Sequence, residues 1–233
     1  MPKPTIGILA GMGPRSTAPF LALVIGACQD ICGARHDVDF PQILVCSQPA
    51  PFYEDRPIDH AALEAATISG LKRLESAHVD FIAIACNTVH IYYANLARSV
   101  SVPLLNIVEL AVDALPLECK RVALVAARPT SDAGIFQSAI AIAGREVVDL
   151  DWQAHVDSML SCVRVTTEPT VFAQLWRPIL SKAAAAQVDA LLVACLDLSG
   201  IVRFAPGGGV PVVDAAQCLA RALVQRWHAA TDG

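Results

Sequence analysis

The stretch VDFIAIAC, residues 79–86, returns as VDALLVAC at residues 188–195. Both copies begin with Val-Asp and end with Ala-Cys, and the second lies 109 residues after the first. A helix-like stretch follows each copy, and Val-Pro then opens another apolar run, VPLLN from residue 102 and VPVVD from residue 210. Landmarks that recur in the same order predict that the chain consists of two similar halves.

The apolar runs of the chain predict its fold class. None of them alternates polar and apolar residues, and such runs suit parallel strands that are covered on both faces. We expect strands at 5–10, 42–47, 81–86, 102–107, 122–127, 146–151, 190–195 and 210–214. We expect helices at 16–32, 60–77, 89–99, 132–143, 169–187 and 215–229. This alternation predicts an α/β fold with parallel sheets.

A third landmark extends the duplication to the first strand. TIGILAG has a counterpart in RVALVAA, which matches Gly11 with Ala127. We therefore predict two similar α/β domains related by a pseudo-two-fold axis. The first would comprise residues 1–102 with 213–233, and the second residues 103–212.

The duplication also predicts where a ligand binds. Ligands of open α/β sheets bind beyond the carboxyl ends of the strands, and Cys86 and Cys195 both follow such an end. If the equivalent edges of the two halves face each other, the active site lies in the cleft between the domains. The two thiols would then occupy opposite walls of that cleft.

Composition excludes several classes of partner. The 233 residues are 55% hydrophobic and 17% charged, which is typical of a compact protein with buried strands. The net charge is −5 and no Lys/Arg-rich run exists, so neither nucleic acid nor an anionic membrane is an expected partner. The N-terminal segment lacks the features of a signal peptide, and no run has the length of a membrane span. We expect a cytoplasmic protein whose cysteines, Cys28 and Cys32 included, are mostly reduced and packed.

Two opposed thiols admit several chemistries. A disulfide needs Cα atoms within about 7 Å, and a reducing cytoplasm disfavours it. A metal site needs further ligands; His90 has a ligand spacing from Cys86, but the second half offers Asp197 instead. A Cys–His nucleophile would leave Cys195 without a role. An acid/base pair, in which one thiolate removes a proton and the other thiol returns one, uses both residues.

Neighbouring residues suit a carboxylate ligand. Asn87 and Thr88 follow Cys86 at a turn into a helix, where side chains and backbone N–H groups bind anions. GMGPRST, residues 11–17, has glycines for close backbone approach, with Ser16 or Thr17 as a helix N-cap. A dinucleotide fingerprint would need glycine at position 16, and the P-loop lysine is absent, so we expect no nucleotide cofactor.

The motifs IGILAGMGPRST and ACNTVH, with a second cysteine at 195, resemble the aspartate/glutamate racemase family over nearly the whole chain. The resemblance implies a cofactor-independent, often dimeric enzyme without a metal, in which Cys86 and Cys195 exchange the roles of base and acid. It also implies that Cys195 faces the L-enantiomer and Cys86 the D-enantiomer. The expected substrate-binding residues are Met12, Gln48, Arg56, Asn87, Thr88, Thr130 and Arg164. His90 and Asp197 are expected in supporting positions.

The chain departs from the family pattern in its second motif. The family usually has GCTE there, whereas this chain has ACLD, so that Leu196 replaces a threonine. Arg56 fits the arginine of aspartate-specific members only if two residues loop out, and Arg164 is the nearest cation to the place of their lysine. We expect a racemase acting on aspartate or glutamate, as a homodimer. A related lyase or cis–trans isomerase on a small dicarboxylate, and a catalytically impaired carboxylate-binding homologue, are the alternatives.

Two further features have local interpretations. APGGGVP, residues 205–211, contains three glycines and is a candidate lid, because glycine permits hinge motion. Asp197 is a candidate helix cap as well as a candidate neighbour that tunes Cys195.

Overall fold

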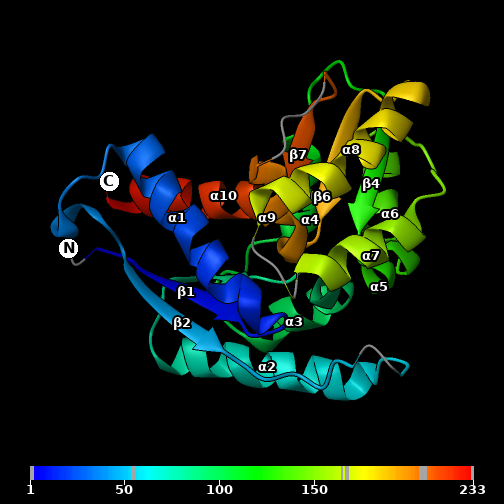
Figure 1. Cartoon of the computed structure of the whole chain (residues 1–233). Helices are drawn as coiled ribbons and strands as arrows, with labels where there is room; N and C mark the ends of the chain where they lie inside the picture. The colour runs from blue at the N-terminus through cyan, green and yellow to red at the C-terminus, as the bar shows by residue number, and fades with distance from the viewer. Residues whose placement is uncertain (1–2, 54–55, 164, 166–167, 205–208, 232–233) are drawn as a thin grey trace. The chain divides into compact units, whose positions relative to one another are not determined.

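A computed structural model of the chain describes residues 3–53, 56–163, 165, 168–204 and 209–231 (Figure 1). The chain forms two compact units, residues 1–106 with 219–233 and residues 107–218. Each unit contains one parallel sheet. The expected α/β fold with two parallel sheets is therefore confirmed. The domain boundaries at residues 102 and 212 stay a prediction.

The first unit has a three-stranded sheet in the order β2-β1-β3. Its strands are β1 (Thr5–Ala10), β2 (Gln42–Ser47) and β3 (Phe81–Ile84). Its helices include α1 (Thr17–Cys32), α2 (His60–Ser76), the 3₁₀ helix η3 (Thr88–Tyr92) and α3 (Tyr93–Ser99). Figure 1 shows α1 and α2 on opposite faces of this sheet, which explains why β1 and β3 are buried almost throughout.

The second unit has a four-stranded sheet in the order β5-β4-β6-β7. Its strands are β4 (Arg121–Ala126), β5 (Glu146–Val147), β6 (Ala190–Ala194) and β7 (Val212–Asp214). Its helices are α4 (Ile107–Asp113), α5 (Arg128–Asp132), α6 (Ile135–Ile142), α7 (Gln153–Val163), α8 (Pro169–Ala185) and α9 (Leu196–Phe204). The last helix, α10 (Ala215–Thr231), begins in this unit and belongs to the first unit from Leu219 onward.

Strand register confirms the internal duplication. In the first unit Leu9 pairs with Ile84, and in the second unit their counterparts, Val125 and Val193, pair with each other. The match of VPLLN with VPVVD holds as well, because the parallel bridge from Ile82 to Leu104 corresponds to the pairing of Leu191 with Val212. A slip of one residue in either sheet would break each of these correspondences. The two sheets therefore have the same strand pairing and the same register, residue by residue.

The repeated Val-Asp pair has a structural role. Asp80 accepts a hydrogen bond from the N–H of Thr5 at the start of β1, 2.6 Å away. Asp189 likewise accepts bonds from the N–H groups of Lys120 and Arg121 at the start of β4, at 2.9 and 2.8 Å. Each aspartate thus satisfies strand-end amides and aligns the beginnings of two neighbouring strands. These hydrogen bonds lower the pKa of Asp189.

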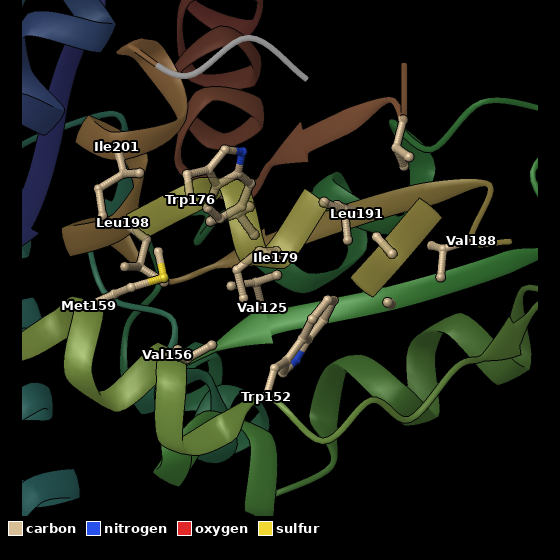
Figure 2. Packing of buried hydrophobic residues seen from close by; sticks show 14 of the residues in the cluster. Val125, Trp152, Val156, Met159, Trp176, Ile179, Val188, Leu191, Leu198 and Ile201 are labelled. Atoms are coloured by element: carbon tan, nitrogen blue, oxygen red, sulfur yellow. The ribbon is translucent and has the colours of Figure 1, made fainter. Parts of the chain in front are cut away.

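The core of the second unit fills one face of its sheet (Figure 2). Trp152, Met159 and Trp176 pack there with Val125 and Leu191. The indole N–H of Trp152 donates to the carbonyl of Leu124, 3.2 Å away, so this large side chain is also held by a polar contact. The elements α7, α8 and α9 are therefore packed tightly against β4 and β6, whose carboxyl ends hold candidate site residues.

Several expected elements differ from the observed ones. The expected strand 102–107 is reduced to one bridge at Leu104, because the chain turns into α4 at Ile107. The expected helix 132–143 corresponds to α6, which begins after Gly134, whose φ is 67°; the short α5 that precedes it was not expected. The expected strand 146–151 pairs over only two residues. Neither α4 nor α7 was expected, since their apolar residues were assigned to strands and connections.

Gly11 permits the turn that follows β1. Its φ is 94°, and an added Cβ would lie 2.6 Å from both the backbone N and O of Gln48. The Gln48 N–H donates to the carbonyl of Ala10 at 2.9 Å, which holds the two chain segments at this separation. Only glycine fits this close approach without displacing backbone atoms.

We predict that Gly11→Ala destabilises the protein by about 2 kcal/mol or more beyond the cost of Gly33→Ala. Gly33 also has a positive φ, of 65°, but an added Cβ there would meet no atom within 4 Å. The two substitutions share the backbone strain, so their difference measures the clash with Gln48. Chemical denaturation followed by circular dichroism measures both, and equal losses of stability would contradict the close approach.

Candidate functional site

Cys86 stands two residues beyond the end of β3. The N–H of Ala85 donates to Leu9 on β1 at 2.8 Å, and the N–H of Cys86 donates to the carbonyl of Ile84 at 2.9 Å. The chain then turns at Asn87 into η3. Cys86 is partly exposed, whereas Ala85 is 3% exposed. The strand end therefore delivers this side chain to the edge of the sheet.

His90 holds the backbone of Cys86 in place. Its Nδ1 lies 2.7 Å from the carbonyl oxygen of Cys86, which only accepts, so Nδ1 bears the proton. The ring stacks on Tyr93 with a centroid distance of 5.9 Å, and the Tyr93 hydroxyl donates to Leu104 at 2.8 Å. Burial lowers the pKa of His90 to about 4, against the opposing effect of backbone hydrogen bonds to Cys86 and Leu105. His90 is therefore neutral at physiological pH and too weak a base for a Cys–His ion pair.

Asn87 presents an unsatisfied side-chain amide. The residue is 3% exposed, and neither its Nδ2 nor its Oδ1 has a hydrogen-bond partner among the described residues. A buried amide without partners costs about 1–3 kcal/mol. This amide lies immediately after Cys86, with the half-buried Thr88 next to it. The arrangement leaves a donor and an acceptor available for a polar ligand beside the thiol.

The loop after β1 is bonded within the first unit. The Thr67 hydroxyl, which donates to the carbonyl of Leu63 at 2.8 Å, lies 3.7 Å from the sulfur of Met12, and Met12 packs against the core. The side-chain oxygen of Gln48 accepts from Arg73 at 2.7 Å, so both substrate-binding candidates have structural contacts here. Ser16 stands at the N-cap of α1, one of the two expected positions, although its side chain makes no capping bond there.

Of the two arginines expected to bind substrate, only Arg56 lies within the described residues. Arg56 is exposed, and its guanidinium lies 4.4 Å from the ring centroid of Tyr53. Arg164 lies outside the described residues, as do residues 205–208 of the candidate lid. The role of either arginine in binding a substrate stays a prediction.

Cys195 occupies the equivalent place in the second unit. It follows β6 directly and precedes α9, and its carbonyl accepts from the N–H of Leu198 at 3.1 Å. Leu196 is 9% exposed and faces the interior. Asp197 lies in the first turn of α9, where the helix dipole favours an acidic side chain. The leucine that replaces the family threonine is thus a core residue of the helix.

Ser199 and Asp214 form a buried polar pair that sequence reasoning missed. The Ser199 hydroxyl donates to Asp214 at 2.8 Å, and the N–H of Ala216 donates to the same oxygen at 3.0 Å. Burial raises the pKa of Asp214 to about 6, although the bonds from Ser199, Ala216 and Gln217 act in the opposite direction. This pair connects α9, which begins beside Cys195, to the start of α10.

A second polar group lies at the carboxyl end of β4. Gln153 donates to the carbonyl of Ala126 at 3.2 Å and to Asp157 at 2.9 Å. Asp157 also pairs with Arg128 at 2.5 Å. Thr130 is fully buried in the same short helix as Arg128. Only Thr130 was expected here, because Gln153 and Asp157 come from the unpredicted α7.

The remaining cysteines are consistent with packing. None of the eight cysteines forms a disulfide, and Cys28 and Cys119 are buried. Burial raises the pKa of Cys28 to about 11, with the nearby Cys32 acting in the same direction. Within the described residues, no group of three His, Cys, Asp or Glu side chains converges as metal ligands would. Among the described helices, none combines the length and apolar character of a membrane span.

The site residues stand in a chain that matches known proteins along most of its length. Residues 9–223 match the family model described as Asp/Glu/hydantoin racemase. The broad specificity amino-acid racemase RacX of Bacillus subtilis (strain 168) is 37% identical over 225 residues, 96% of this chain and 98% of the relative. The chain belongs to the Asp/Glu/hydantoin racemase family.

The structure of this racemase-family chain is similar to solved structures of an aspartate racemase and of an aspartate racemase homologue. Aspartate racemase from Picrophilus torridus is 26% identical with a TM-score of 0.81, covering 97% of this chain and 94% of that one. An aspartate racemase homologue from Pyrococcus horikoshii OT3 is 21% identical with a TM-score of 0.79, covering 96% and 99%. The second similarity shows the fold alone.

His90 of this racemase-family protein is expected to act by positioning Cys86. We predict that His90→Leu lowers kcat about 100-fold with little change in KM, because displacing a reacting group by about 1 Å costs this much. His90→Asn retains a donor for the Cys86 carbonyl and should stay within about tenfold of wild type.

His60→Leu is the matched control, since the His60 ring bonds the Tyr92 hydroxyl at 2.7 Å and packs against the ring of Tyr92 instead of holding the Cys86 carbonyl. Steady-state kinetics with each variant measure the split between kcat and KM. A His90→Leu variant with wild-type kcat would contradict the positioning role.

Asp214 is expected to make stability depend on pH. Its folded pKa of about 6 exceeds the ordinary 3.8, so its contribution is fully present below about pH 4 and is lost as pH rises through 6. Asp214→Asn keeps an oxygen for Ser199 and Ala216 without a titrating group. We predict that the unfolding free energy of this variant gains roughly 2 kcal/mol on wild type between pH 4 and pH 7.

Urea denaturation at a series of pH values measures this difference. Asp149→Asn, at an exposed position, should show no such trend. A constant difference between Asp214→Asn and wild type across the pH range would rule out the raised pKa.

Proposed function

We propose that this amino-acid racemase inverts the Cα of its substrate by proton transfer between two thiols, Cys86 and Cys195. The observation that supports this proposal is their equivalence. Cys86 follows the carboxyl end of β3, which pairs with β1, and Cys195 follows that of β6, which pairs with β4. The residues of these two strand pairs are in matching register. A duplicated thiol suits a reaction that needs one base and one acid of the same kind.

In the proposed reaction, one cysteine begins as thiolate and the other as thiol. The thiolate takes the Cα proton, and the electron pair of the C–H bond moves into the substrate carboxylate. The other thiol then protonates Cα from the opposite face, so that the two cysteines end with exchanged protonation states. No electron is transferred, and no cofactor is required by this scheme.

Asn87 is proposed to bind the carboxylate that gains charge in the transition state. Its buried amide has no partner among the described residues, and it adjoins Cys86 in the turn before η3. A donor that is already desolvated and oriented stabilises developing charge more than one that must reorganise. Thr88 and Thr130 are proposed to assist as hydroxyl donors, with Met12 lining the pocket.

The proposed substrates are 2-amino acids. Aspartate and glutamate are the candidates that the sequence suggests, and the broad specificity named for the Bacillus subtilis relative adds uncharged 2-amino acids. Arg56 and Arg164 remain candidates for a second carboxylate. A homodimer and a cytoplasmic location stay predictions.

We predict that the wild-type protein, incubated in D₂O without added cofactor, replaces the Cα proton of at least one acidic or uncharged 2-amino acid and interconverts its enantiomers. The Cys86→Ser, Cys195→Ser double variant should lose both activities by at least about 10³-fold, because a serine hydroxyl is a far weaker acid than a thiol at neutral pH. Proton NMR and chiral chromatography measure the two rates.

The Cys28→Ser, Cys32→Ser double variant is the matched control and should retain the wild-type rate. Exchange that persists in the Cys86/Cys195 variant would rule out the two-thiol mechanism. Turnover of malonate or maleate derivatives without amino-acid exchange would favour a lyase or isomerase. Thermal stabilisation by amino acids without any turnover would favour a binding protein.

A further inference from the structure

We infer that Asp157 is a specificity-determining residue of this enzyme. Its negative charge offsets the positive charge of Arg128, which reduces the preference of the enzyme for substrates with a second carboxylate over uncharged ones. The inference rests on the proposed racemase function. It concerns the preference between acidic and uncharged 2-amino acids, which the two thiols do not determine. Neither residue was a candidate in the sequence.

Arg128 lies at the same sheet edge as Cys195. Ala126 pairs with Ala194 in the parallel register of β4 and β6, so Ala127 and Cys195 each stand one residue beyond the paired strands. Ala127 and Cys195 also pack against the same core cluster. Because neighbouring strands lie about 4.8 Å apart, Arg128 begins its helix close to the backbone of the catalytic cysteine.

The duplication gives the same placement by a separate route. The match that aligns Gly11 with Ala127 aligns Met12 with Arg128. Met12 is the residue after β1 that the resemblance assigns to the pocket lining. The second half therefore has a cation at the position where the first half has a thioether.

Asp157 is held against Arg128 by its own helix. Its Oδ2 lies 2.5 Å from the Arg128 guanidinium, and its Oδ1 accepts from Gln153, one helical turn earlier, at 2.9 Å. Gln153 also donates to the carbonyl of Ala126, the last residue of β4. The carboxylate is thus anchored to the strand end, and Arg128 meets a fixed negative charge.

This anchoring changes what the site edge offers a substrate. The side chains of Arg128 and Asp157 are 55% and 37% exposed, so the arginine is accessible to a ligand but already neutralised. A second substrate carboxylate would be attracted by Arg128 and repelled by Asp157, with little net effect. Without the aspartate charge, Arg128 would attract that carboxylate, and an uncharged side chain would gain nothing.

The test compares near-isosteric substrates that differ in one charge. For wild type and Asp157→Asn, kcat/KM is measured for aspartate against asparagine and for glutamate against glutamine. We predict that Asp157→Asn raises the acidic-to-amide ratio about two- to fivefold at low salt, the effect of a partly exposed ion pair. Added salt should reduce the gain, because it screens the charge. The Arg128→Gln, Asp157→Asn double variant should return the ratio to the wild-type value.

The matched control is Glu146→Gln on β5, next to the start of β4. Glu146 pairs with Arg121 at 3.2 Å, with comparably exposed side chains of 58% and 41%. Loss of this ion pair should leave the acidic-to-amide ratio of kcat/KM unchanged. A general effect on folding should also leave this ratio unchanged, because it lowers the activity on both substrates alike. An unchanged ratio in Asp157→Asn, or an equal change in Glu146→Gln, would overturn the inference. If wild type exchanges no 2-amino acid at all, it is the proposed function that fails.

Discussion

The parallel pairing of the first strand of each sheet with the strand that ends in Ala-Cys is the constraint on which the site depends. In the first unit Asp80, just before β3, accepts a hydrogen bond from the first amide of β1. In the second unit Asp189, just before β6, does the same for the first amide of β4. Both strands then run buried to their carboxyl ends, so Cys86 and Cys195 emerge at defined positions. A slip of one residue would turn each thiol to the opposite face of its sheet.

The two halves share this frame but differ in what surrounds the thiol. Beside Cys86 stand an unsatisfied amide, Asn87, and a neutral histidine that holds the cysteine carbonyl. Beside Cys195 stand an apolar helix residue, Leu196, and charged or polar pairs anchored to strand ends. In the proposed mechanism, unequal surroundings of the two thiols suit a chiral substrate, since its two faces need not be bound alike.

The sequence predicted the central strands well, because β1, β3, β4 and β6 are buried on both faces and therefore uniformly apolar. It failed where apolar residues belong to helices. The residues IVELAVD of α4 were partly assigned to a strand, and α7 has an amphipathic pattern too short and mixed to stand out.

The candidate site shows the same division. Cys86, Asn87 and Cys195 were identified because they lie next to strands within recognisable repeats. The pair of Ser199 with Asp214 and that of Arg128 with Asp157 join residues 15 and 29 positions apart. Single residues of this kind are common in exposed helices and turns, and only folding shows which of them meet.

The most direct test of the two-thiol account is the enantiomer that each single cysteine variant deprotonates in D₂O. If each thiol serves one face of Cα, Cys86→Ser should exchange the Cα proton of one enantiomer without inversion, and Cys195→Ser that of the other. Proton NMR on separate L- and D-samples of one substrate measures this. Exchange of the same enantiomer by both variants, or racemisation by either one, would contradict the account.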